Sequence, residues 1–302
     1  MTLLDQLMLV RVCPNLARTA TERLGARVQA AEQQTVAAAW GPGTLPVAVA
    51  TPPRLYLSMD GVMVQTAQGW REYKLGIAYT TVTRPARDHP GRDEVHAQEL
   101  SFVGDVTDAA AFGQLLWCEA ARRGLLTAAE VVVVADGAHW IWNVVAEHFP
   151  EATQIVDWYH ASQYVWQVAH VVYGEGTPLA RCWAKRRLAD LWAGRVGKVR
   201  TAFTAQRTRG QVVEEALTYF TNHQHRMAYA EYRARGLQIG SGSVESGCKQ
   251  VIAACLKQAG MRWSLPGARA VAAIRTRLKS GRWAETLALR PPRQRAYQRQ
   301  AA

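Results

Sequence analysis

The chain has 302 residues, of which 49% are hydrophobic, so it is long and apolar enough to bury the core of one or two domains. Its five cysteines are scattered and show no CxxC spacing, which excludes a cysteine zinc motif and argues against a disulfide framework. The sequence has no run of 18 apolar residues and no secretory leader pattern, so we expect a cytoplasmic protein without a membrane span.

The formal net charge of +12 is concentrated in the second half of the chain. Residues 245–302 hold 12 Lys and Arg against 2 Asp and Glu, and residues 161–236 hold 12 against 5. A concentrated positive field suits a polyanion, because each neutralised phosphate releases condensed counterions. The charge therefore favours a nucleic-acid partner, and a basic surface without any partner is the plainer alternative.

Residues 1–50 predict one or two helices followed by a Gly/Pro-rich linker. Three strands are expected next, over residues 54–64, 70–82 and 96–106, with a polar loop at 84–94. A helix follows, which Thr107 or Asp108 caps at its start and Gly124 ends.

The run EVVVVADG at 130–137 predicts a short strand that is buried on both faces of a sheet. A helix that ends before Pro150 and a fifth strand at 152–160 come after it. From residue 161 to residue 236 strand signals vanish and apolar residues follow the helical period. This stretch predicts an all-helical insert.

A Gly/Ser turn at 240–243 leads into a helix that carries Cys248 and Cys255 on its core face, and a last helix begins near Ser264. The Pro/Gln/Arg-rich end predicts a disordered tail. Strands and helices in this order indicate an α/β fold with a mixed sheet flanked by helices. The expected parts are a helical segment with its linker (1–50), the α/β domain (51–160 and 237–285), the inserted helices (161–236) and the basic tail (286–302).

Three acidic residues stand at positions that suit a shared site. Asp60 and Asp136 each end a predicted strand before a glycine, and ligands of α/β proteins bind beyond such strand ends. Glu245 lies in the first turn of the helix after the Gly/Ser turn. The plainer interpretations are Asp-Gly turns for the two aspartates and a helix-dipole carboxylate for Glu245.

Together these carboxylates predict a hard-oxygen site for two Mg²⁺ or Mn²⁺ ions rather than for zinc. Two such ions stabilise the attacking and leaving oxygens of a phosphoryl transfer. Asp157 and His160 close the fifth predicted strand as accessory residues. Asp157 could replace Asp136 as a ligand, and His160 could contact phosphate or transfer a proton, although a strand-end cap and a satisfied histidine are equally consistent with the pattern.

Basic and aromatic residues after Glu245 predict the DNA contact. Trp263 stands between Arg262 and Ser264, where an indole can stack on a splayed base. Trp140, Trp142 and Trp158 fit core packing better. The residues expected to bind DNA are Lys249, Arg262, Trp263, Arg275 and Arg277.

Two long stretches resemble a known family. They read VVVVADGAHWIWNVVAEHFPEATQIVDWYHASQYV and RGLQIGSGSVESGCKQVIAACLKQAGMRWS, and with YLSMDG they span most of residues 54–283. They are similar to bacterial insertion-sequence transposases of the Kra type, which are related to Mutator-like DDE transposases with an RNase H-like catalytic fold. The resemblance gives Asp60, Asp136 and Glu245 the three catalytic positions. It matches Asp157 and His160 to an accessory motif of an acid or cysteine, two residues and a histidine.

The resemblance implies a DNA transposase that cleaves transposon ends and transfers strands into target DNA, active as a homodimer and associated with the bacterial nucleoid. No helix-turn-helix or zinc motif precedes Asp60, so the resemblance does not extend to an N-terminal DNA-binding region. A catalytically silent DNA-binding remnant and a hydrolytic nuclease of the same fold stay open as alternatives. A nucleotide-binding enzyme is disfavoured, because no GxGxxG or Walker loop follows a predicted strand.

Overall fold

The computed structural model describes residues 13–85 and 93–290. Most of the predicted polar loop, the first 12 residues and the tail after residue 290 lie outside these ranges. Five strands form one sheet in the order β3-β2-β1-β4-β5. The strands are β1 (Arg54–Thr66), β2 (Gly69–Pro85), β3 (Asp93–Asp105), β4 (Glu130–Ala135) and β5 (Thr153–Val156).

The sheet is mixed, as the sequence predicts. β1, β2 and β3 pair antiparallel, whereas β4 pairs parallel to β1 and β5 parallel to β4. β4 reads EVVVVA and its last four residues are buried, because β-branched side chains fit a strand that is covered on both faces.

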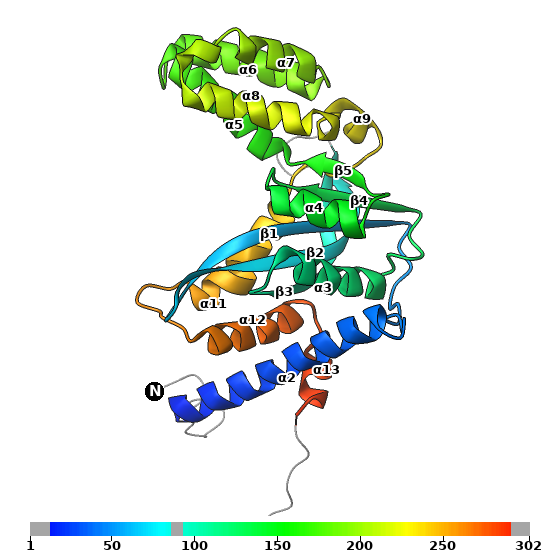
Figure 1. Ribbon diagram of the computed structural model, residues 1–302. Helices are drawn as coiled ribbons and strands as arrows, with labels where there is room; N and C mark the ends of the chain where they lie inside the picture. Colours follow the sequence, from blue (N-terminus) through cyan, green and yellow to red (C-terminus); the bar gives the residue numbers. More distant parts are fainter. Residues whose placement is uncertain (1–12, 86–92, 291–302) are drawn as a thin grey trace, which may run out of the picture.

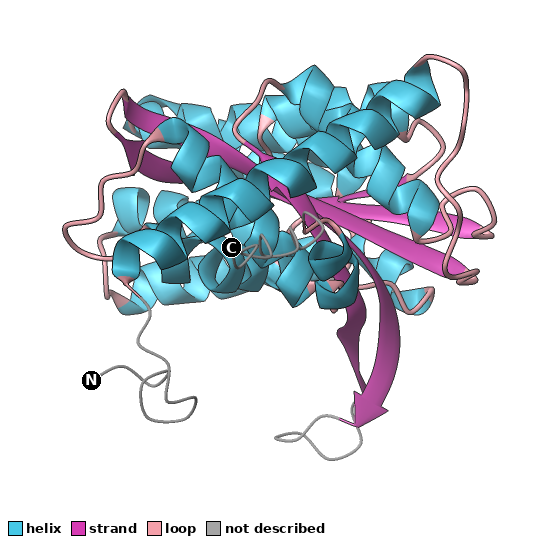
Figure 2. Cartoon of the chain, turned by 90° about the horizontal axis from the view of Figure 1, so that it is seen from below, coloured by secondary structure: helices cyan, strands magenta, loops and turns pink. Residues whose placement is uncertain are grey.

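Helices cover both faces of the sheet (Figures 1 and 2). A Cβ placed on Gly76 of β2 would touch Phe112 and Leu116 of α3 (Ala109–Arg122), so α3 covers that face. The neighbouring residue Leu75 points to the other face, where it meets Gly247 of α10 (Gly242–Gly247). As predicted, Asp108 caps α3 by accepting a hydrogen bond from the Ala111 amide at 2.8 Å.

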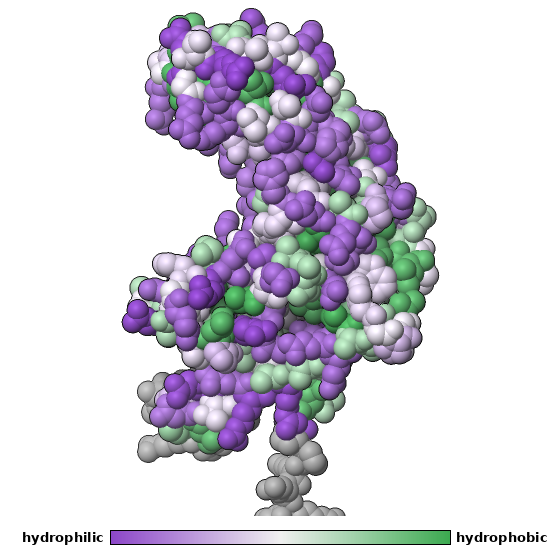
Figure 3. Space-filling model, viewed as in Figure 1, coloured by the Kyte–Doolittle hydropathy of each residue, from purple (hydrophilic) through white to green (hydrophobic). Residues whose placement is uncertain are grey.

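The predicted insert is helical throughout and forms a lobe above the sheet in Figure 1. Its core contains Trp183, Phe203 and Phe220, which pack ring against ring. Figure 3 shows the surface hollowed between this lobe and the sheet. The helices of the lobe are α5 (Trp158–Tyr173), α6 (Pro178–Trp192), α7 (Val196–Thr204), α8 (Gln211–His223) and α9 (Tyr229–Ala234), and α4 (His139–His148) lies between β4 and β5.

After α10 the chain forms a π-helical segment (Cys248–Ala253), the short α11 (Ala254–Leu256), α12 (Leu265–Lys279) and α13 (Trp283–Ala288). Ser264 caps α12 through a 3.1 Å bond from the Gly267 amide, and the predicted helix start near Ser264 is confirmed. α13 extends to Ala288, so the prediction of a disordered tail from residue 286 is wrong for its first three residues. These residues are held because Thr286 is fully buried beneath the helix.

The long helix α2 (Pro14–Trp40) lies against α12. A Cβ on Gly25 would overlap the backbone of Ala270, so glycine permits this close crossing. None of the helices in the described ranges is both long enough and apolar enough to cross a membrane.

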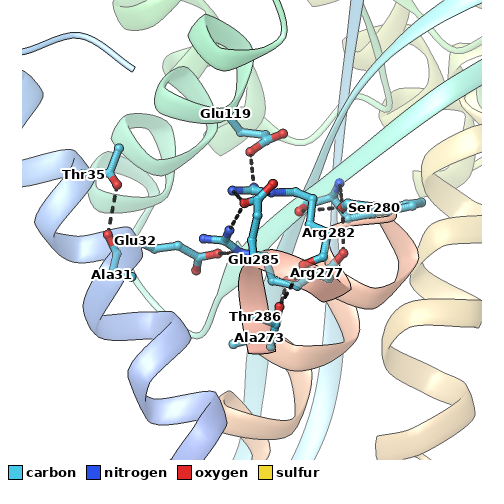
Figure 4. Close-up of polar contacts among 12 residues, drawn as sticks. Ala31, Glu32, Thr35, Glu119, Ala273, Arg277, Ser280, Arg282, Glu285 and Thr286 are labelled. Carbon is cyan, nitrogen blue, oxygen red and sulfur yellow. Dashed lines mark hydrogen bonds and ion pairs between the residues drawn. The ribbon is translucent and has the colours of Figure 1, made fainter. Parts of the chain in front are cut away.

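An ion network joins α2, α3, α12 and α13 (Figure 4). The Arg277 guanidinium lies 3.0 Å from the carboxylates of Glu32 and Glu285. Arg282 lies 2.9 Å from Glu119. Arg277 exposes only 9% of its side chain, so this network is part of the interior.

Candidate metal site and nucleic-acid surface

Three aspartates lie level with one another on neighbouring strands. Leu57 of β1 pairs with Val133 of β4, and continuing this register by three residues brings Asp60 level with Asp136. Ala135 of β4 pairs with Val156 of β5, so Asp136 is likewise level with Asp157. We call Asp60, Asp136 and Asp157 the acid row.

Asp136 follows the last residue of β4, as predicted. The prediction that the fifth strand runs from 152 to 160 and closes with His160 is wrong, because β5 ends at Val156 and Asp157 instead caps α5, which contains His160. The prediction that Asp60 ends its strand is wrong, because β1 continues to Thr66. Asp60 pairs with Leu75 within a long ladder to β2, and this pairing overrides the turn tendency of the Asp-Gly dipeptide. A Cβ on Gly61 would first meet the Glu72 carboxylate, the end of a flexible side chain on β2.

Asp60 lies half-buried beneath the helix that carries Glu245. Its Oδ1 accepts a 2.7 Å hydrogen bond from the Gly61 amide, and its Oδ2 lies 3.5 Å from the Cys248 thiol. Burial raises the pKa of Asp60, and the nearby Asp136 carboxylate raises it further. Cys248 was predicted as a core residue, and its burial confirms this; its contact with Asp60 had no signal in the sequence.

Asp136 is positioned by backbone groups at the start of α4. Its Oδ1 accepts from the Ala138 amide at 2.9 Å, and its carbonyl accepts from the Trp142 indole at 2.9 Å. Tyr219 of α8 packs so closely on Gly137 that a Cβ there would overlap its ring. The buried Tyr219 hydroxyl has no hydrogen-bond partner among the described residues. The inserted lobe thus reaches the acid row through this tyrosine.

Asp157 is fully buried at the start of α5, where the lobe joins the sheet. Its Oδ1 caps the helix by accepting from the His160 amide at 2.8 Å, and its Oδ2 accepts from the Ser241 amide. Burial acts to raise the pKa of Asp157, but the bonds from His160 and Ser241 outweigh it and hold the pKa below its usual value.

His160 lies between Asp157 and Glu245. Its Nδ1 is 3.3 Å from Asp157 Oδ1, which is an ion-pair distance, and this nitrogen makes no well-directed hydrogen bond. The contact with Asp157 raises the pKa of His160. One ligand atom from each of Asp157, His160 and Glu245 lies within 4.8 Å of the other two. Among the described residues, no other group of three potential ligands is this close.

Within the described residues, Glu245 thus forms a three-ligand group with the accessory pair, whereas Asp60, Asp136 and Glu245 form no group of this closeness. Glu245 and Asp60 still line one depression of about 380 Å³, together with Lys249 and Lys257. None of the described lysines or arginines forms an ion pair with Glu245 or with the acid row. Four carboxylates and one imidazole, with no described lysine or arginine paired to them, fit a hard divalent cation.

The predicted DNA contacts divide into two groups. Lys249 and Arg262 are exposed and free to meet a phosphate backbone. Trp263 is half-buried, and its indole donates to the Leu256 carbonyl at 3.2 Å. Its backbone pairs with Thr66 at the end of β1, so its position is set by the β1–β2 hairpin.

The other two arginines have structural roles. Arg275 donates to the carbonyls of Gln250 and, at 3.2 Å, Val251 in the π-helical segment. Arg277 is buried in the ion network, so the prediction that it binds DNA is wrong. Its place on the inner face of α12 depends on α2, a partner distant in the sequence.

The sequence matches no protein-family model and no curated protein. Proposals about its chemistry therefore rest on the residues described above and on the resemblance of its motifs.

Proposed function

We propose that this chain is a metal-dependent DNA transposase built on an RNase H-like core. The sheet order, with three antiparallel strands followed by two parallel ones, is that expected of such a core. The helical lobe stands between β5 and the helix of Glu245, where the motif resemblance implies an insertion. The observation that carries the proposal is the acid row, whose carboxylates come together without a basic partner other than His160.

Asp60, Asp136 and Glu245 would hold two Mg²⁺ or Mn²⁺ ions, with Asp157 and His160 at the edge of the site. When bound, such ions stabilise negative charge on the attacking and leaving oxygens of a phosphodiester. His160 holds its proton more firmly than a free imidazole because Asp157 is beside it. In its charged form it can donate a strong hydrogen bond to a phosphate oxygen.

Exposed basic residues close to the site would bind the DNA backbone. Lys249 and Lys257 line the same depression as Asp60 and Glu245, and Arg262 follows on the surface. Each phosphate contact releases counterions, so binding should weaken steeply with salt. Transposition joins two ends to one target, and we expect a homodimer in the active complex.

The test compares metal binding and DNA cleavage in the wild type and in Asp136→Asn. We expect calorimetry with Mn²⁺ to show binding that the variant loses, and cleavage to fall by at least about 100-fold, as when a preorganised electrostatic contact is removed. Glu151→Gln is the matched control, because Glu151 is exposed and outside the site. Equal Mn²⁺ binding by the wild type and Asp136→Asn would contradict the proposal.

Two alternatives are separated by the products. A hydrolytic nuclease of the same fold would cut DNA in Mg²⁺ but give no strand-transfer product. A silent DNA-binding remnant would bind DNA equally well after Asp60→Ala and would not cleave it in any metal.

A further inference from the structure

A large pocket adjoins the acid row and is not needed to hold the metal. Its volume is about 770 Å³, and three walls enclose it: the first turn of α5, the loop before α10, and β3. Aromatic rings dominate the wall on the side of the helical lobe. The lining of the pocket includes Trp158, Tyr159, Trp192, Arg233 and Gln238.

Two of these rings reach the surface. Tyr159 is 64% exposed and Trp192 is 42% exposed, unusually high values for large aromatic side chains. Trp158 packs against Trp192 at a steep angle, with ring centres 4.9 Å apart. The Arg233 guanidinium lies over the Trp192 ring, 3.6 Å from its centre. These contacts hold Trp192 in place, and the exposed parts of both rings offer aromatic surface to a planar group.

The pocket and the acid row share two structural elements. Tyr159 and Asp157 lie in the same turn of chain, and Tyr159 lies directly over Gly240, where a Cβ would approach its ring to 2.9 Å. The next residue, Ser241, donates its amide to Asp157. The Trp158 amide donates to the Ile239 carbonyl at 2.9 Å, which fixes this loop to α5. A group bound at the acid row therefore has the pocket as its immediate neighbour.

We propose that this pocket binds an unpaired nucleobase of the DNA strand whose phosphate is held at the acid row. The proposal rests on the proposed function, since it takes DNA as the substrate. A base has two flat faces for Tyr159 and Trp192, and stacking on aromatic rings tolerates any sequence. A base also has a polar edge, and the Gln238 amide oxygen at the pocket is buried without a hydrogen-bond partner.

The lining favours a base over an apolar peptide side chain. Arg233 keeps a cation over the Trp192 ring, and Glu94 and His96, 3.5 Å apart, bring further polar atoms to the β3 wall. Among the described residues, the buried Arg233 Nε and Gln238 Oε1 have no hydrogen-bond partner; an apolar side chain would leave them so, whereas the polar edge of a base can pair with them. The expected ligand is therefore a single nucleotide pulled out of, or never part of, a duplex.

The experiment compares two oligonucleotides of equal charge with the full chain in EDTA. One is a 15-mer of thymidine, and the other is an abasic 15-mer with the same backbone. We expect fluorescence anisotropy to show about tenfold tighter binding of the thymidine strand, which is the scale of one or two stacked bases. Tyr159→Ala and Trp192→Ala should reduce this ratio to about twofold and leave abasic binding unchanged. Tyr159→Phe, which keeps the ring, should retain the ratio.

Trp283→Ala is the matched control, because Trp283 is similarly exposed (40%) but lies on α13, outside the pocket. A second measurement does not depend on variants: a strand with one 5-iodouracil should, after irradiation, cross-link to Tyr159 or Trp192 in the wild type. Three results would overturn the proposal that this pocket binds a base: equal affinity for both strands, binding of neither strand, or a cross-link only to residues outside the pocket. Metal-dependent cleavage that Asp136→Asn abolishes would leave the proposed function standing in each of these cases. Tighter binding of the thymidine strand without any DNA cleavage would support base binding by the pocket but not the proposed transposase function.

Discussion

The ion network of α2, α3, α12 and α13 and the acid row at β1, β4 and β5 both gather carboxylates, but only the network supplies guanidinium partners. Arg277 lies 3.0 Å from Glu32 and from Glu285 (Figure 4). Buried charges are tolerated when they are paired and hydrogen-bonded. The network is therefore complete in the isolated chain and contributes to the fold.

The acid row has His160 as its single basic neighbour at ion-pair distance among the described residues. Burial raises the pKa of Asp60, and repulsion from the Asp136 carboxylate adds to this effect. Such repulsion costs stability in the isolated chain and becomes useful when a cation is bound. Two groups of similar side chains thus differ in whether the protein provides the counter-charge.

The largest expected effect is in the network. Arg277→Ala leaves the buried Glu32 without its ion-pair partner, whereas Glu285 keeps Arg282 at 2.7 Å, and the change should lower the free energy of unfolding by about 3–5 kcal/mol. Urea denaturation measures it. Arg207→Ala is the control, because its pair with Glu214 is exposed to solvent and its loss should leave the free energy of unfolding nearly unchanged. Similar losses in both variants would show that the network does not depend on burial.

Glu32 should make stability depend on pH. Burial, which outweighs Arg277 and Arg282, raises the pKa of Glu32 from 4.5 to about 7. The folded chain then binds this proton more tightly than the unfolded chain, so stability falls as pH rises from 4.5 to 7, by roughly 3 kcal/mol, and is level above that range. Denaturation curves at several pH values should lose this slope in Glu32→Gln. A slope of opposite sign in the wild type would mean that Arg277 dominates.

Removing a charge from the acid row should not lower the free energy of unfolding, in contrast to Arg277→Ala in the ion network. Without metal, Asp136→Asn relieves repulsion with Asp60, and the amide oxygen can still accept from the Ala138 amide. We expect the free energy of unfolding in EDTA to be unchanged or to rise by about 1 kcal/mol. Added Mg²⁺ should stabilise the wild type and not the variant. A loss above about 2 kcal/mol in EDTA would place Asp136 among the structural acids.

The smallest effect concerns DNA. Lys249→Ala should lower the slope of log affinity against log salt by about 0.9, the value for one phosphate contact. Arg18→Ala, an exposed change on α2, should leave the slope unaltered. The measurement is duplex binding from low to moderate salt. An unchanged slope for Lys249→Ala would show that the DNA backbone does not contact the depression beside Asp60 through this lysine.

Local signals predicted much of this fold. The cap Asp108, the start of the last long helix near Ser264 and the apolar strand β4 depend on neighbouring residues, so the sequence was sufficient for them. Asp60 could not be placed correctly, because the continuation of β1 depends on pairing with β2. The burial of Arg277 depends likewise on α2, which precedes it by more than 200 residues.

For the candidate site, too, the sequence predicted the features that depend on neighbouring residues and missed those that depend on distant ones. The sequence singled out all five of its candidate ligands, because acids and a histidine next to strand and helix ends are conspicuous. It did not predict that Glu245 would form a three-ligand group with Asp157 and His160, since that depends on the loop through Ser241. The rings of Trp192 and Tyr159 likewise line one pocket only after the lobe has folded back.

The close crossing of α2 and α12 sets an order of events during synthesis. α2 leaves the ribosome early, yet the helix that covers Gly25 is completed only at Lys279. Glu245 also emerges late, after the whole helical lobe. Domains fold as they emerge, from the N-terminus onward. A growing chain therefore carries an uncovered α2 and an incomplete set of acids until its last helices appear.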